Sequence, residues 1–132
     1  MRSTIRVLLI ILLGVGSVRF IDLLELTPGG LFCQRSDQAS LVAPGGTLIL
    51  TRFTADCTWF GGARTSYVLL NPVDEPLHAQ YIILAVDGRL DPPAALAWAT
   101  NSSVVLTIPP GPEPSRLIAR TFGVSIELHR TR

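Results

Sequence analysis

Short apolar runs of five to eight residues, separated by Gly, Pro, Asn and Asp, fill the chain beyond residue 33. This alternation of apolar runs and turn residues is typical of an all-β fold. The pattern therefore predicts seven or eight short strands, arranged as a compact sandwich or as a partly closed barrel. The expected strands lie at residues 38–42, 47–54, 65–71, 79–86, 94–100, 104–108, 116–122 and 124–130.

Two of these runs indicate how the strands are buried. The run at 79–86 is apolar on both faces, which favours a central strand. The run at 124–130 alternates regularly, so we expect Val124, Ile126 and Leu128 to point into the core. Nearly every connection is short enough for a hairpin, whereas a parallel pair needs a crossover of about a dozen residues or more. Antiparallel pairing is therefore expected.

The run at 94–100 allows two interpretations. It follows Asp91-Pro92-Pro93 and is rich in alanine, so an N-capped helical turn is one of them. The alternation of Leu96 and Trp98 favours the other, which is a strand.

The N-terminal part of the chain has a different pattern. A basic flank precedes an uncharged apolar run of 12 residues at 7–18, which matches an export signal. The run is shorter than the roughly 20 residues of a membrane-spanning helix. Residues 1–18 are thus expected to be an apolar helix that acts as a cleaved signal peptide or as a short membrane anchor. Residues 19–32 would then form a connector. Residues 33–132 would form an extracytoplasmic β domain, either periplasmic or secreted, or anchored in the cytoplasmic membrane.

The chain has two cysteines, Cys33 and Cys57, and an even count in an exported protein predicts a disulfide. A second hypothesis is a secreted hydrolase in which Cys57 is the nucleophile and His78 or His129 is the base. Neither histidine lies in a sequence context known from cysteine proteases. A metal site is not expected, because these cysteines and histidines show no CxxC or HxxxH spacing.

The segment TWFGGAR, residues 58–64, is the candidate binding site. Aromatic side chains beside glycines and an arginine can form a recognition surface. The candidate binding residues are Trp59, Phe60, Arg64 and Tyr67. In the alternative interpretation, Trp59 and Phe60 fold back and close an open end of the β domain.

Charge and motifs narrow the class of function. The net charge of +1 gives no reason to expect a nucleic acid partner. The chain has no GxGxxG, P-loop or GxSxG motif, so no cofactor and no catalytic residues are expected. The sequence thus predicts a non-catalytic domain that binds a protein or another component of the cell envelope. If residues 1–18 are retained, the membrane is a further partner, and a structural accessory subunit of a membrane complex becomes an alternative.

The order of motifs also resembles a known group of proteins. An apolar leader and a first cysteine precede an APGG turn at 43–46, a strand ending in ADC at 55–57, the segment ALAWATNSSVVLTIPP at 95–110 and a closing GVSIEL strand at 123–128. This order resembles small exported bacterial β-domain proteins of uncharacterised function, with two cysteines and an SPDG-type turn. The resemblance implies the fold and the compartment, and it implies no activity. The Cys-Gly-Ala-Thr usual in the group is replaced here by Cys-Thr-Trp-Phe after residue 56, so no shared loop function is implied.

Overall fold

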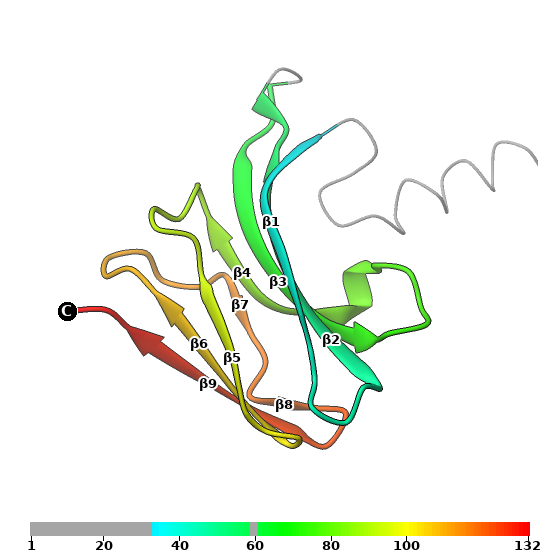
Figure 1. The fold of residues 1–132 in the computed structure, drawn as a ribbon. Coiled ribbons are helices and arrows are strands. Elements are labelled where there is room, and N and C mark those ends of the chain that lie inside the picture. The colour runs from blue at the N-terminus through cyan, green and yellow to red at the C-terminus, as the bar shows by residue number, and fades with distance from the viewer. Residues whose placement is uncertain (1–32, 59–60) are drawn as a thin grey trace, which may run out of the picture.

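The computed structural model describes residues 33–58 and 61–132, which form two β-sheets (Figure 1). The predicted signal or anchor at 1–18, the connector at 19–32 and the candidate residues Trp59 and Phe60 lie outside the described residues. The all-β prediction is confirmed. The strands are β1 (Gln34–Val42), β2 (Leu48–Asp56), β3 (Arg64–Pro72), β4 (Ile82–Asp87), β5 (Ala95–Thr100), β6 (Ser103–Ile108), β7 (Arg116–Leu117), β8 (Arg120–Thr121) and β9 (Val124–Arg130).

The larger sheet has five antiparallel strands in the order β1-β2-β3-β4-β7. Its first hairpin turns at the predicted APGG segment, where Gly46 has a φ of 77° and the N–H of Ala43 donates to the carbonyl of Leu48 at 2.8 Å. A non-glycine side chain rarely adopts such a positive φ. Residues 79–81, expected at the start of a strand, instead form the short 3₁₀ helix η2 (Ala79–Tyr81) before β4.

The smaller sheet has four strands in the order β5-β6-β9-β8. β5 forms an antiparallel hairpin with β6, so the strand interpretation of residues 94–100 is confirmed. The expectation of antiparallel pairing is wrong for β6 and β9, which are parallel. Residues 109–123 connect these two strands, and this segment is long enough for the crossover that a parallel pair requires. The segment divides on the way, since β7 pairs with β4 and β8 pairs with β9.

The two sheets share one hydrophobic core and do not close into a barrel. Val124 and Ile126 are buried in this core and Leu128 packs against it, as the alternation predicts. The other face of the larger sheet carries a second cluster that includes residues from β4, which explains why β4 is apolar on both faces. The main core contains Leu50, Val68, Leu70, Ile83, Leu84, Val86, Leu90, Ala94, Val104, Leu106, Ile108, Val124 and Ile126, and the second cluster contains Phe53, Ala55, Leu69, Ile82 and Ala85.

Candidate functional site

A disulfide joins Cys33 and Cys57, as predicted. Cys33 directly precedes β1 and Cys57 directly follows β2. Gln34 and Asp56 are paired residues in the β1–β2 ladder, so the two cysteines come next in the same register, with Cα atoms 4.5 Å apart. Cys33 also packs against the second hydrophobic cluster. The bond therefore fixes the point where the chain enters the β domain to the start of the β2–β3 loop.

Beside the disulfide, the carboxylate of Asp56 organises the base of the β2–β3 loop. It accepts hydrogen bonds from the hydroxyl of Thr58 at 2.6 Å and from the backbone N–H of Thr58 at 3.0 Å. It also accepts from Nε of Arg64 at 3.0 Å, which makes a cross-strand ion pair. The two hydrogen bonds from Thr58, followed by the hydrogen bond and the positive charge of Arg64, lower the pKa of Asp56 below its ordinary value.

The two glycines of the loop are required by its tight turn. Gly61 has a φ of 75°, and the N–H of Gly62 donates to the carbonyl of Cys57 at 3.1 Å. A Cβ atom on residue 62 would lie 2.9 Å from the Cβ of Cys57, closer than two such atoms approach in real structures. The backbone of Gly62 therefore packs directly against Cys57 of the disulfide.

The candidate binding residues do not all share one face. Arg64 is exposed at the start of β3, on the same side of the sheet as Asp56. Tyr67 lies three residues later, and side chains alternate along a strand, so its ring lies on the opposite face. There it packs 5.6 Å from the ring of Phe53, which the guanidinium of Arg35 covers at 4.7 Å. The structure thus places Arg64 beside the β2–β3 loop and assigns Tyr67 to the second hydrophobic cluster.

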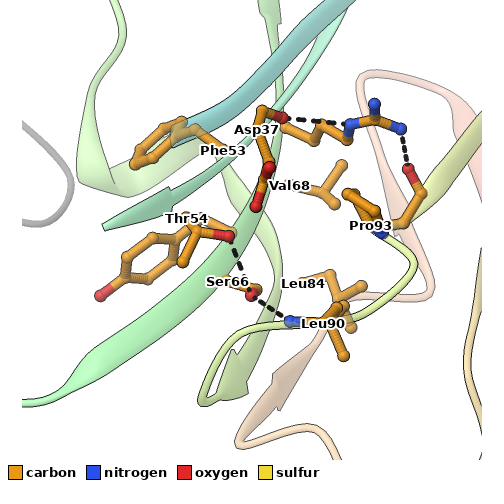
Figure 2. Close-up of a pocket in the computed structure, with 11 residues that line it drawn as sticks. Asp37, Phe53, Thr54, Ser66, Val68, Leu84, Leu90 and Pro93 are labelled. Carbon is orange, nitrogen blue, oxygen red and sulfur yellow. Dashed lines mark hydrogen bonds between the residues drawn. The ribbon is translucent and has the colours of Figure 1, made fainter. Parts of the chain in front are cut away.

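A small pocket lies on the inner face of the larger sheet, and Figure 2 shows the residues around it. Arg52 spans the pocket, since its Nε donates to the carbonyl of Asp37 at 3.3 Å and its Nη1 donates to the carbonyl of Ala94. The carboxylate of Asp37 in turn accepts two hydrogen bonds from Arg89, at 3.0 and 3.2 Å. These bonds raise the pKa of Arg89.

Ser66 forms the other polar part of the pocket wall. Its buried hydroxyl donates to the carbonyl of Gly88 at 2.8 Å. It also accepts from the N–H of Leu90 at 3.2 Å, as Figure 2 shows. Thr54 lies beside it, with the two hydroxyl oxygens 3.4 Å apart. The polar groups of the pocket are therefore engaged with one another, and they hold the segment between β4 and β5 against the larger sheet.

Sequence reasoning missed Asp37, Arg52, Ser66 and Arg89. One signal was present, because Arg52 and Ser66 each lie next to a buried apolar residue in the inward row of their strand. Arg52 follows Leu50 on β2, and Ser66 precedes Val68 on β3. Asp37 gave no such signal, since it sits at a β-bulge with a φ of 56° that interrupts the alternation of β1.

The two histidines have partners outside the disulfide region. Nδ1 of His78 accepts from the N–H of Gln80 at 3.1 Å and caps η2. Nε2 of His129 lies 3.5 Å from a carboxylate oxygen of Glu127 on β9. The sulfur of Cys57 is held in the disulfide, so it is not a thiolate while that bond is intact. Within residues 33–58 and 61–132, no group of three His, Cys, Asp or Glu side chains is placed to hold a metal ion.

Comparisons with protein-family models, with curated proteins and with solved structures found no match to this chain. In the part of the chain that the structure describes, no helix is long and apolar enough to cross a membrane.

Proposed function

We propose that this chain is a non-catalytic, exported β domain that binds a protein or another component of the cell envelope through its β2–β3 loop. The observation that carries the proposal is the Cys33–Cys57 disulfide at the base of that loop. Disulfides persist in oxidising compartments outside the cytoplasm, which supports export. The bond also restricts the motion of the loop base, and a rigid loop loses less conformational entropy when it binds.

The composition of the loop supports a binding role. Arg64 is about half exposed, with 52% of its side-chain surface accessible, although Asp56 fixes its position. An arginine that is held in place but still exposed retains unused N–H donors for a partner. Trp59 and Phe60 follow Thr58 in the sequence, and tryptophan and arginine are enriched among the residues that dominate binding energy.

A pull-down from cell envelopes tests the role of the loop. The full chain is compared with the variants Trp59→Ala and Arg64→Ala, and with Arg120→Ala as the matched control. Arg120 is also exposed, but it lies on β8 in the other sheet. A partner that the wild type and the control retain, and that both loop variants lose, supports the proposal. Identical partner profiles for all four proteins would remove the loop from it.

The hydrolase hypothesis requires a reduced Cys57, and an alkylation experiment on the native protein distinguishes it. The oxidised cysteine of the structure predicts no labelling unless a reductant is added first. Rapid labelling without reductant would reopen the hydrolase hypothesis.

An intact mass of the protein from its native envelope tests the compartment, because cleavage removes the leader and the disulfide removes two hydrogens.

A further inference from the structure

β5 is an edge strand, since the order β5-β6-β9-β8 places it at one end of the smaller sheet. An edge strand leaves the N–H and C=O groups of its outer side without strand partners, and these groups can pair with a strand of another chain. Folded proteins usually protect such edges with charged side chains, proline, β-bulges or very short strands. Among the described residues, the edge strands of the two sheets differ in how far they are protected in these ways.

The other three edge strands are protected. β7 and β8 are two residues long and carry Arg116 and Arg120. β1 has nine residues, but its pairing shifts at the bulge between Ser36 and Ala39. The bulged residue Asp37 is also held by the ion pair with Arg89.

β5 has six residues and contains neither a charged residue nor a proline. Its register shifts only near its end, between Trp98 and Thr100. Ala95, Ala97 and Ala99 are exposed, and Leu96 and Trp98 pack against the core. β5 is thus the one edge strand among the described residues that is both long and uncharged.

Exposed apolar side chains lie beside this edge. Nε1 of Trp98 donates to the carbonyl of Leu41 at 3.0 Å, which places the end of β1 next to β5. Leu41 and the following Val42 are 40% and 50% exposed. The exposed apolar side chains at the end of β1 therefore lie close to this edge.

We propose that β5 is the docking edge for a second copy of this chain, whose own β5 pairs with it in antiparallel orientation. An extended, uncharged strand with small residues at alternate positions suits this edge, and β5 itself has these properties. Because the strand carries no charge, two copies bring no like charges together. The contact is the same on both copies, so it closes as a two-fold dimer and leaves no further β5 edge free.

The sequence of β5 favours one register. If Ala97 faces Ala97 of the second copy, then Ala95 faces Ala99, and Leu96 faces Trp98. Directly opposed residues of neighbouring strands lie on the same face of a sheet. All outward pairs are then alanine with alanine, while the inward pairs bring together leucine and tryptophan. The two four-stranded sheets would become one continuous sheet.

Sedimentation velocity of the full chain over a range of concentrations tests the proposal. We expect a monomer–dimer equilibrium that depends on concentration, because pairing of a single short strand falls in the class of small, transient interfaces below about 1,200 Å². Ala97→Lys places two ammonium groups across the two-fold axis and is expected to weaken dimerisation by about tenfold or more. The matched control is His129→Lys, which adds the same charge to β9, a strand of the same sheet that β6 separates from the β5 edge. A wild type that stays monomeric at every concentration overturns the proposal, as does an Ala97→Lys variant that dimerises like the wild type.

Cross-linking provides a second test that adds no charge. Opposed residues of an antiparallel pair have Cα atoms about 4.5 to 5.5 Å apart, within the range that a disulfide spans. Oxidation of Ala97→Cys is therefore expected to give a reducible dimer, and oxidation of His129→Cys is not. Equal cross-linking of the two variants would contradict the proposed edge. The β2–β3 loop lies on the other sheet, so Arg64→Ala should dimerise like the wild type, and failure of the loop proposal leaves this one intact.

Discussion

Reduction of the Cys33–Cys57 disulfide should lower the free energy of unfolding by about 3.5 kcal/mol. The two cysteines are 24 residues apart, so the bond closes a loop of about 25 residues in the unfolded chain. In the chain-entropy model, loss of that constraint increases the entropy of the unfolded state by roughly 12 cal/mol/K, which gives this value at 25 °C. A domain of this size has a net stability of about 5 to 15 kcal/mol, so the bond accounts for a large share of it.

Urea unfolding of the full chain, with and without reductant, measures this difference on one unchanged sequence. With a slope of roughly 1 to 3 kcal/mol/M, the midpoint should fall by about 1 to 3.5 M. The double variant Cys33→Ala/Cys57→Ala serves as the control and should match the reduced wild type. A loss below about 1 kcal/mol would refute the loop-closure argument. A loss well above about 5 kcal/mol would show that the bond also holds native contacts of β1 that do not form without it.

Three further substitutions test single features of the fold. Ser66→Ala leaves the carbonyl of Gly88 and the N–H of Leu90 without their partner. The free energy of unfolding, measured with urea, should fall by about 1 to 3 kcal/mol. The control Ser125→Ala, at an exposed position, should change it by no more than about 0.5 kcal/mol. Leu106→Ala at a fully buried core position should cost about 2 to 5 kcal/mol by the same measurement. Asp56 has a lowered pKa in the fold, so its ionised form stabilises the protein above the unfolded pKa of about 3.9, and that contribution disappears as the pH falls through the folded pKa. Asp56→Asn should therefore be less stable than the wild type at pH 7, and its free energy of unfolding should fall less steeply as the pH is lowered to acid. A fall as steep as that of the wild type would contradict the role of this carboxylate.

The strands and the disulfide were predictable from the sequence because both depend on local or simple signals. Alternation placed Val124 and Ile126 in the core, and turn residues separated most of the runs. An even cysteine count behind an apolar leader was enough to predict the bond between Cys33 and Cys57.

The parallel pairing of β6 and β9 was not predictable from the same signals. The segment at 116–122 looks like one strand that forms a hairpin with the next, and part of it does, since Thr121 pairs with Val124. The segment divides at Ile118 and Ala119, whose backbone groups bond to different sheets. The N–H of Ile118 donates to the carbonyl of Ile83, and the carbonyl of Ala119 accepts from the N–H of Ile126. A division of this kind depends on where the two sheets lie in space, which periodicity along the chain does not record.

The candidate site was predictable only in part. Arg64 lies beside the loop as expected, but Tyr67 belongs to the other face. Their separation of three residues within one strand already implied this outcome, because side chains alternate with a period of two. The pocket could not be predicted, since it depends on the bulge at Asp37 and on contacts with Arg89, which is 52 residues away.

The change of polarity along the inner face of the larger sheet explains why the disulfide lies where it does. From Leu50, the inward positions of β2 run through Arg52 and Thr54 to Asp56 and become polar toward the β2–β3 loop. Figure 1 shows that this end of the sheet projects past the strands of the smaller sheet. The inward side chains are therefore polar where the loop begins, and the disulfide and the Asp56–Arg64 ion pair stabilise the loop base. That arrangement fixes the base of the loop while Thr58 and Arg64 remain exposed there, which is what the proposed binding role requires.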